Sequence, residues 1–585
     1  MSDESISVTW KRTHYAGVLR AADEGKDVVL CGWVQKTRDM GHLVFVDIRD
    51  REGLAQVVFQ SDRPDLMEEA KRLRNESVIG IRGRIRHRSA VNTEMATGEV
   101  EVEALGLHVF AVAKLPPFQI TDPPQASEEL RFKYRYLDLR RPKMQRQIRL
   151  RHDAALAVRN YMNKNGFLEI ETPILANPTP EGARDYLVPS RIYKGRFYAL
   201  PQSPQQFKQT LMISGFDRYF QIVRCFRDED LRADRQPEFT QIDIEMSFID
   251  REEFYGLNEG LMDAVFAVTG QKLALPFPRL SYAEAMEKYG SDKPDLRVPL
   301  EMKDVTAVGR DIASDVIRGA LDAGAELKGL LVPGAANYSR GQLDKLNEKA
   351  KSLGAKGLFW IKKQDVWKSS LKLAEADFLK VWAALGGGEN DLALFVADKK
   401  NVALKVLGEI RRTWPMDEAA KKKMLRFVWV TDFPLFEWSE EEQRNVSMHH
   451  PFTSPVEEDV PLLETDPAKI RAKAYDLILN GVEVGGGSVR IHDMDLQRRI
   501  FKVLGLSDAE TETKFGYFLE ALSFGAPPHG GIAFGFDRLV MLLAGEESIR
   551  EVIPFPKTTS ALDLMTGSPS EVDERQLAEL GLKLK

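Results

Sequence analysis

The residues with the clearest chemical signal lie at 226–248, where a charged stretch (FRDEDLRADRQPE) joins two apolar, strand-like segments. This pattern is typical of two strands connected by a polar loop. In the second segment Asp243 and Glu245 alternate with Ile242 and Ile244, which predicts one buried face and one acidic face. A solvated hairpin would look similar. An arginine-rich loop beside an acidic row also suits a site that binds an anion and an amino group together.

A second chemical segment is VEVGGGSVRIH at 482–492. Three consecutive glycines weaken a strand, so they make sense where a ligand or another backbone approaches closely; a β-bulge is the alternative. Glu483 precedes the glycines and Arg490 follows them. The segment therefore predicts a carboxylate that can hold a metal ion near a guanidinium that can bind an anion.

Two further segments carry candidate binding residues. In PPHGGIAFGFDRL (527–539) Gly535 would let a planar ligand lie on the backbone, with Arg538 stacked over it. In PQSPQQFK, Lys208 is either a ligand-binding cation or a surface lysine. No P-loop sequence occurs, and the adjacent histidines at 449–450 lack the spacing of a helical zinc site, so substrate contact or a structural pair remains for them.

Composition describes an ordinary globular protein of several domains, with 585 residues, 43% apolar and 29% charged. Two distant cysteines exclude a disulfide framework and a cysteine-based zinc site, and they fit a reducing cytoplasm. We expect no membrane span and no secretion signal. The net charge of −6 is uneven, since residues 131–152 hold nine Lys or Arg against one acid.

The elements that must position these residues begin with short strands over 14–113, with one helical stretch before the fourth strand. This order predicts a small five-stranded barrel of the oligonucleotide-binding (OB) type. Four arginines alternate along 82–88, which suits either a phosphate-tracking face or a charged edge strand. The side chains expected on the nucleic-acid face are Arg38, Phe45 and Gln56.

Beyond the barrel the sequence predicts a proline-rich linker, a long helix near 143–165 and a strand at FLEIETPIL. Antiparallel strands and helices follow, and the character of the sequence changes between 297 and 420. The predicted organisation is a barrel domain at 1–113, a hinge at 114–142, a second domain in two parts at 143–296 and 421–566, an inserted domain at 297–420 and a tail at 567–585.

Together these segments resemble the class II aminoacyl-tRNA synthetases, and specifically the bacterial-type aspartyl-tRNA synthetases. The motifs that carry the resemblance are TPEGARDY, QSPQ, FRDEDLRADRQPEFTQ, HHPFTSP and EVGGGSVRIH, and the match covers essentially the whole chain. It implies an α+β multidomain fold with an OB-fold anticodon-binding barrel, a class II antiparallel-sheet catalytic domain and an inserted α+β domain. It also implies a homodimer, formed through the long helix and the strand after it.

The resemblance implies the ligation of L-aspartate to tRNA(Asp), with ATP as substrate and Mg²⁺ as cofactor. The catalytic residues that it implies are Arg227, Glu229 and Arg538. Aspartate would be bound by Glu181, Ser203, Gln205, Lys208, Arg227, Asp243, His449 and Arg490. ATP would be bound by Arg227, Asp228, Glu229, Gln236, Glu483, Gly535, Phe536, Asp537 and Arg538. The metal ion would be bound by Asp476 and Glu483, and the anticodon by Arg38, Phe45 and Gln56.

Three alternatives stay open. An asparaginyl- or lysyl-tRNA synthetase is the nearest, but a lysine enzyme should carry acids where Lys208 and Arg490 stand. A non-catalytic tRNA-binding relative is another, although the implied catalytic residues are all present. Finally, Met40 stands where relatives that also charge tRNA(Asn) tend to carry histidine, so we expect strict use of tRNA(Asp).

The barrel also departs from the family at QKTRD (35–39), which puts phosphate contacts there in doubt.

Overall fold

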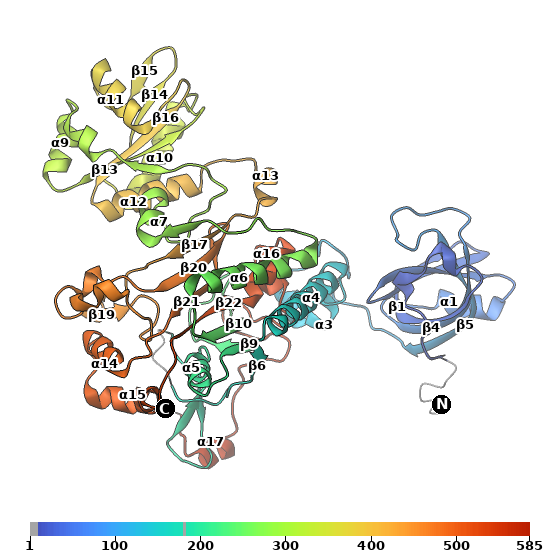
Figure 1. The fold of residues 1–585 in the computed structure, drawn as a ribbon. Coiled ribbons are helices and arrows are strands. Elements are labelled where there is room, and N and C mark those ends of the chain that lie inside the picture. Colours follow the sequence, from blue (N-terminus) through green and yellow to red (C-terminus); the bar gives the residue numbers. More distant parts are fainter. Residues whose placement is uncertain (1–9, 179–182, 585) are drawn as a thin grey trace. The chain divides into compact units, whose positions relative to one another are not determined.

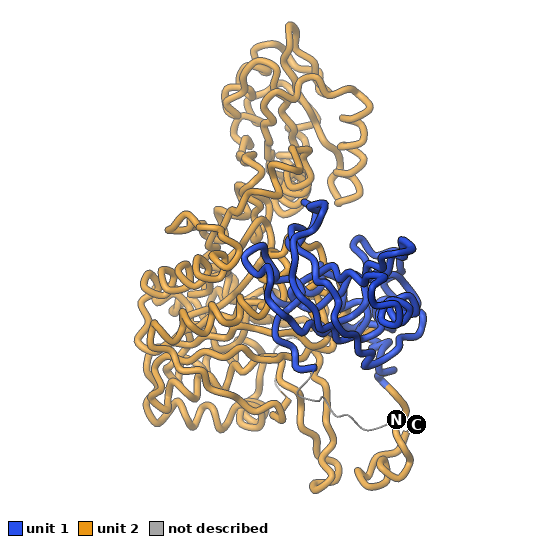
Figure 2. Tube along the Cα trace, turned by 90° about the vertical axis from the view of Figure 1, so that its right-hand side faces the viewer, with its two compact units in different colours: residues 1–149, 554–558, 562–569 blue, residues 150–553, 559–561, 570–585 orange. Residues whose placement is uncertain are grey.

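The computed structural model describes residues 10–178 and 183–584 of the chain. Its contacts divide the chain into two compact units (Figure 2). The first comprises residues 1–149, 554–558 and 562–569, and the second comprises residues 150–553, 559–561 and 570–585. Across the described residues no helix is both long and apolar enough to cross a membrane.

The first unit contains the predicted barrel, which confirms the OB-type architecture. Its five strands close in the order β1-β2-β3-β5-β4, and one helix lies between β3 and β4 in the sequence. Inward-facing aliphatic side chains such as Leu30, Val46 and Ile81 fill its interior. The elements are β1 (Asp27–Asp39), β2 (Leu43–Asp50), β3 (Gly53–Gln60), α1 (Pro64–Lys71), β4 (Val78–His87) and β5 (Val100–Ala111). Short helices α2 (Glu128–Lys133) and α3 (Arg135–Asp138) follow.

The arginine-rich strand β4 has neighbours on both sides, β1 and β5, so the edge-strand interpretation is wrong. The phosphate-tracking interpretation stays a prediction. Arg84 lies 2.8 Å from Asp27, and Arg86 lies 3.0 Å from Glu101. These arginines are matched by acids of the barrel itself, because neighbouring strands place opposite charges on one face.

The second unit is built on an eight-stranded sheet with the order β11-β17-β20-β21-β22-β10-β9-β6 (Figure 1). Only the two outer pairs, β11–β17 and β6–β9, are parallel. The strands are β6 (Leu168–Glu169), β9 (Arg218–Phe226), β10 (Glu238–Ser247), β11 (Arg279–Ser281), β17 (Phe427–Thr431), β20 (Ala474–Leu479), β21 (Val482–Val489) and β22 (His529–Gly535).

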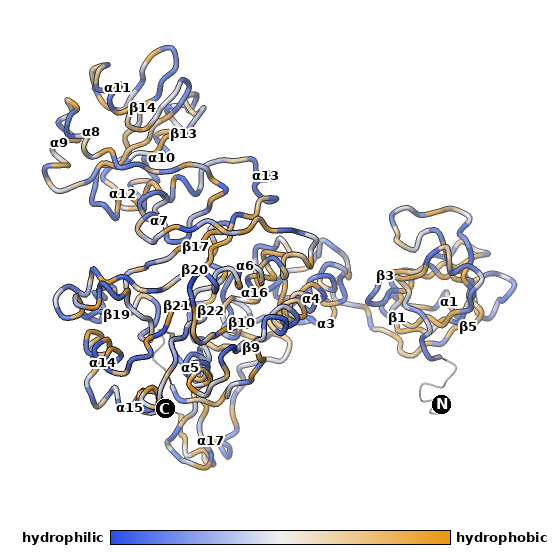
Figure 3. The backbone as a smooth tube through the Cα atoms, viewed as in Figure 1, coloured by the Kyte–Doolittle hydropathy of each residue, from blue (hydrophilic) through white to orange (hydrophobic). Residues whose placement is uncertain are grey.

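Helices cover this sheet and enclose two hydrophobic cores. Figure 3 shows hydrophobic sequence along its central strands. These helices are α4 (Pro142–Lys164), α5 (Gln205–Ile213), α6 (Arg251–Phe266), α7 (Tyr282–Tyr289), α14 (Met494–Val503), α15 (Asp508–Ser523) and α16 (Phe536–Ala544). A further helix near the C-terminus, α17 (Glu574–Leu580), buries none of its residues. Two small hairpins are β7 (Leu187–Pro189) with β8 (Phe197–Ala199), and β18 (Phe436–Ser439) with β19 (Arg444–Ser447).

Strands β9 and β10 form the antiparallel pair predicted at 226–248. The solvated-hairpin alternative is wrong, because β10 lies inside the sheet between β9 and β22 and is buried on both faces. Asp243 and Glu245 have no exposed surface. The strand predicted at FLEIETPIL is limited to β6, which pairs only with β9 at the edge of the sheet.

The inserted region has its own five-stranded antiparallel sheet in the order β12-β13-β16-β14-β15. Separate hydrophobic clusters accompany it. Its elements are β12 (Met302–Asp304), α8 (Thr306–Arg310), α9 (Asp315–Asp322), β13 (Glu326–Val332), α10 (Arg340–Ser352), β14 (Phe359–Lys363), β15 (Trp367–Ser369), α11 (Glu375–Leu385), β16 (Leu392–Asp398) and α12 (Lys400–Arg412), followed by α13 (Glu418–Lys422).

Candidate active site

A cavity of about 720 Å³ opens in the second unit over strands β10, β21 and β22. It is lined by most of the residues that the sequence predicts for substrate, ATP and metal. The predicted residues that line it are Ser203, Gln205, Lys208, Arg227, Glu229, Gln236, Asp243, His449, Asp476, Glu483, Arg490, Gly535, Asp537 and Arg538.

Two predicted site residues do not line this cavity. Phe536 is buried in the hydrophobic core, and its ring packs under the guanidinium of Arg151. Asp228 does not line the cavity, and its carboxylate lies 3.9 Å from Arg184. Glu181 lies outside the described residues.

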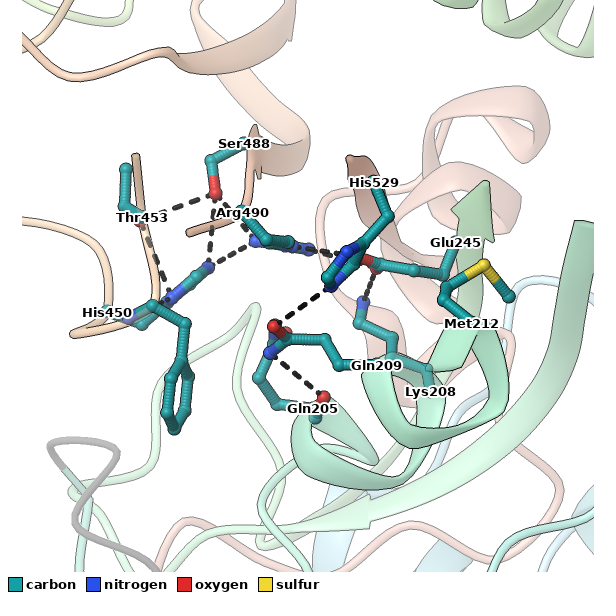
Figure 4. A network of polar contacts seen from close by, with 12 residues as sticks. Gln205, Lys208, Gln209, Met212, Glu245, His450, Thr453, Ser488, Arg490 and His529 are labelled. Atoms are coloured by element: carbon teal, nitrogen blue, oxygen red, sulfur yellow. Dashed lines mark hydrogen bonds and ion pairs between the residues drawn. The ribbon is translucent and has the colours of Figure 1, made fainter. Parts of the chain in front are cut away.

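The floor of the cavity is a network of buried charges (Figure 4). Lys208 Nζ lies 2.7 Å from Asp243 Oδ1 and 3.2 Å from Glu245 Oε2. Arg490 donates two hydrogen bonds to Glu245, through Nε at 2.9 Å and Nη2 at 3.1 Å. Its Nη1 donates to Ser488 Oγ at 2.6 Å and also contacts His450 Nε2. Two cations and two carboxylates therefore hold one another in fixed positions.

These neighbours shift the pKa values of the buried groups in different directions. Burial alone would raise the pKa of Glu245, but the charges of Arg490 and Lys208 lower it to about 2. Burial raises the pKa of Asp243 despite the opposing charge of Lys208. Burial, followed by the charge of Arg490, lowers the pKa of His450 well below its usual value. His450 is therefore neutral, which lets Nε2 accept a hydrogen bond from Arg490.

Sequence reasoning missed Glu245, His450 and Ser488 as members of this network. The signal for Glu245 was its position in the acidic row of β10, which the sequence alone could not separate from a solvated face. Gly531, opposite Glu245 on β22, leaves room for this carboxylate, because a Cβ there would lie 1.9 Å from Glu245 Oε2.

Asp476 on β20 and Glu483 on β21 face the same small space above Gly486. A Cβ on Gly486 would lie 2.7 Å from Asp476 Oδ1 and 3.6 Å from Glu483 Oε1. Each carboxylate has a basic neighbour: His449 Nε2 lies 3.3 Å from Asp476 Oδ1, and Lys293 Nζ lies 2.7 Å from Glu483 Oε2. Burial and the nearby charge of Glu483 raise the pKa of Asp476.

The carboxylate oxygens of Asp476 and Glu483 suit a hard cation whose remaining coordination positions are filled by other ligands. Within residues 10–178 and 183–584 no group of three or more His, Cys, Asp or Glu side chains is arranged to hold a metal ion. Two carboxylate oxygens suit Mg²⁺, which usually takes one or two protein carboxylates together with water and phosphate oxygens.

Two arginines face the cavity with unused hydrogen-bonding capacity. Arg227 lies over the ring of Phe239, with 5.1 Å between the guanidinium carbon and the ring centre. Arg538 donates to the backbone oxygen of Glu483 at 2.7 Å and to Asp234 at 3.1 Å. The buried Nε atoms of Arg227 and Arg538 have no hydrogen-bond partner among the described residues. Both side chains can therefore donate to an incoming anion.

The three residues predicted for the nucleic-acid face lie together on the barrel. Arg38 pairs with Asp47 through two hydrogen bonds of 2.7 and 2.9 Å and donates to Gln56 Oε1 at 3.1 Å. Phe45 lies opposite Arg38 in the β1–β2 register and is half-buried. The face thus combines a guanidinium held by Asp47, a buried amide and a half-buried aromatic ring, and its use in anticodon binding stays a prediction.

Comparison with known proteins decides the family. The family model described as class II tRNA synthetases (D, K and N) matches residues 127–559, and that of the OB-fold nucleic acid binding domain matches residues 28–110. An aspartate–tRNA(Asp/Asn) ligase of Caldanaerobacter subterraneus is 52% identical over 98% of both chains. The chain belongs to the class II tRNA synthetases of the aspartyl type.

Other relatives with similar sequences belong to the same family as this synthetase. Ligases with the same printed name from Syntrophotalea carbinolica and Geotalea uraniireducens are 50% and 52% identical over 98% of both chains. Among solved structures, asparaginyl-tRNA synthetase from Pyrococcus horikoshii has a TM-score of 0.59 at 20% identity, covering 93% of this chain and 98% of that one. Aspartyl tRNA synthetase from Entamoeba histolytica has a TM-score of 0.58 at 19% identity, covering 94% and 92%. These two similarities show the fold.

Proposed function

We propose that this synthetase activates L-aspartate with ATP and transfers the aspartyl group to the 3′ end of tRNA(Asp). The observation that carries this proposal is the buried pair of cations, Lys208 and Arg490, on the cavity floor. A substrate side chain with a carboxylate can bind there, whereas lysine would meet like charge. An amide carries no negative charge, so it would gain less from these two cations than a carboxylate does.

In the first step an oxygen of the aspartate α-carboxylate attacks the α-phosphorus of ATP. The bond from phosphorus to the bridging oxygen breaks, and pyrophosphate leaves with the electron pair. A carboxylate is already ionised at neutral pH, so no protein base or nucleophile is needed. Arg227 would bind the α-phosphate and the α-carboxylate, and Arg538 the triphosphate, so that positioning and charge stabilisation lower the barrier.

In the second step the terminal 3′-hydroxyl of the tRNA attacks the aspartyl carbonyl, and AMP leaves. Glu229 and Gln236 would hold the ATP end of the site, and Ser203, Gln205 and Asp243 the amino group. Asp476 and Glu483 would hold Mg²⁺, which neutralises charge on the phosphates when it is bound. His449 already contacts Asp476, so it links the substrate side of the cavity to the metal side.

The decisive test is aspartate-dependent exchange of pyrophosphate into ATP, followed by charging of purified tRNA(Asp). We expect exchange with aspartate and none with lysine or asparagine. Absence of exchange with aspartate would overturn the assignment. Exchange with asparagine at a similar rate would show that the two cations do not select the substrate.

Charging of tRNA(Asn) is a second candidate activity, favoured by the printed names of the relatives, which include both tRNAs. The strict use of tRNA(Asp) predicted from Met40 stays a prediction. Met40, directly after β1, has 60% of its surface exposed and is therefore available to contact a nucleotide. Parallel charging of both purified tRNAs separates these candidates, and Met40→His tests whether this position sets the preference.

The proposal includes a homodimer and a cytoplasmic location. Leu168, Ile174 and Leu175, after α4, expose about half of their apolar surface, which suits a contact with a second copy. The two cysteines are free thiols, in keeping with a reducing compartment. Sedimentation equilibrium of the wild type and of Leu175→Glu tests the dimer, and an unchanged mass for the variant would remove this surface from the interface.

A further inference from the structure

The segment that leads from α7 into the inserted domain carries a lysine into the active-site cavity. Lys293 lines the cavity with its neighbour Asp292, and its Nζ lies 2.7 Å from Glu483 Oε2. The backbone near Lys293 is held in place: Arg297 pairs with Asp295 at 2.8 Å and donates to the backbone oxygen of Asn480 at 3.2 Å. The ammonium is therefore presented to Glu483 by a fixed stretch of chain.

The position of the ammonium matters because of what Glu483 faces. The carboxylates of Glu483 and Asp476 point into the same space above Gly486, where two like charges repel one another. The ammonium of Lys293 offsets that repulsion with one positive charge and one hydrogen bond. A divalent ion bound to the same two carboxylates would lie within a few ångströms of the ammonium and would be repelled by it.

We propose that the ammonium of Lys293 pairs with Glu483 in the absence of ATP and so competes with the metal ion. The divalent ion then binds only together with the phosphates of ATP. The side chain can leave Glu483, since 41% of it is exposed and its four-carbon stem is flexible. A triphosphate in the cavity offers the ammonium other oxygens, which frees Glu483 for the ion. Lys293 is thus a positioning residue, and this inference rests on the proposed metal site at Asp476 and Glu483.

The alternative is an ion pair that only fixes the segment before the inserted domain. Mn²⁺ binding separates the two, because it is measured by the loss of the free-ion signal in electron paramagnetic resonance and does not depend on turnover. The full-length protein is titrated with Mn²⁺ alone, as wild type, as Lys293→Met and as Lys293→Met/Glu483→Gln. Lys272→Met, which removes an exposed lysine of the same unit, is the matched control.

We expect Lys293→Met to bind Mn²⁺ without nucleotide at least about tenfold more tightly than the wild type, because the competing positive charge has gone. Adding Glu483→Gln should abolish this gain, Lys293→Arg should bind as weakly as the wild type, and the Lys272→Met control should not differ from it. Unchanged Mn²⁺ affinity in Lys293→Met would overturn the inference, and so would a gain that survives Glu483→Gln.

A second titration, with Mn²⁺ and a non-hydrolysable ATP analogue, tests the proposed metal site separately from the proposed role of Lys293. If Glu483→Gln weakens Mn²⁺ binding with the analogue while Lys293→Met changes nothing without it, the proposed metal site stands and the role of Lys293 falls. If Glu483→Gln leaves Mn²⁺ binding with the analogue unchanged, the metal site itself is misplaced. Thermal unfolding of each variant shows whether the fold is retained.

Discussion

At the scale of single residues, the site depends on charges that fix one another before substrate arrives. The sequence indicated Arg490 because an arginine beside a glycine-rich motif suggests anion binding, whereas Lys208 was assigned through the resemblance to the family. It could not lead to their shared partner, Glu245, because the three residues come from α5, β10 and the position after β21, and they meet only in the folded protein. Lys293 was missed for the same reason, since its partner Glu483 is far away in sequence.

Replacing Arg490 tests the proposed substrate contact. Arg490→Leu should lower kcat/KM for aspartate by about 2–5 kcal/mol, roughly 30- to 4,000-fold, because one partner of a buried charge pair is lost. Binding of ATP alone should change little. Pyrophosphate exchange and nucleotide titration measure the two effects. Arg499→Leu, which removes an exposed ion pair with Glu464, is the control, and unchanged aspartate kinetics in Arg490→Leu would exclude the contact.

His450 makes stability depend on pH. Its folded-state pKa lies well below the usual 6.5, so below that pH the unfolded chain takes up a proton that the folded chain does not. Folded-state stability should therefore fall as pH drops below about 6.5, by up to about 1.4 kcal/mol per pH unit. His450→Gln should lose less of its thermal midpoint between pH 7.5 and 5.5 than the wild type. The exposed His152→Gln should follow the wild type, and parallel losses in all three would contradict this role.

At the scale of elements, the alternation of apolar and polar residues correctly predicted the barrel and the β9–β10 pair, because a strand with one buried face shows this alternation in its own sequence. It failed at FLEIETPIL, where the extent of a strand depends on the neighbour that pairs with it. Strand β9 offers a partner to only two of those residues. The strand order of the inserted domain was likewise not predicted, since it depends on contacts between distant segments.

The glycines of β21 should separate folding from chemistry. A Cβ on Gly487 would lie 2.0 Å from the backbone oxygen of Gly531 on β22, so Gly487→Ala must move a strand and should cost about 1–3 kcal/mol of stability. A Cβ on Gly486 would meet mainly the carboxylate of Asp476. Gly486→Ala should therefore keep a near-normal thermal midpoint but raise the KM for ATP. Equal midpoints for the two variants would contradict this distinction.

At the scale of the whole molecule, the inserted domain is joined to the catalytic sheet through the chain that also carries Lys293. Arg411, in α12, is buried and donates to the backbone oxygens of Asp295, Val298 and Leu300. One side chain thus fixes the path of the chain that enters the domain. This contact could not be predicted from the sequence, because an arginine near the end of a helix is usually exposed.

Arg411→Met should loosen that connection. Three buried carbonyl oxygens would lose their donor, and each such loss costs about 1–3 kcal/mol. We expect faster cleavage of the inserted domain by trypsin under native conditions and a lower thermal midpoint. Arg412→Met, which removes only an exposed ion pair with Glu409, should match the wild type in both measurements. Equal cleavage rates for the two variants would show that Arg411 does not anchor the domain.

The paired charges on the cavity floor also determine how the enzyme responds to salt. Lys208 and Arg490 are balanced by Asp243 and Glu245, so the floor exerts little long-range attraction on aspartate in solution. Dissolved ions screen interactions across a Debye length of about 8 Å at physiological ionic strength, but they hardly affect buried pairs. Raising the salt concentration should therefore leave the KM for aspartate nearly constant while weakening the capture of tRNA. A steep rise in the aspartate KM with salt would mean that the floor attracts its substrate from a distance.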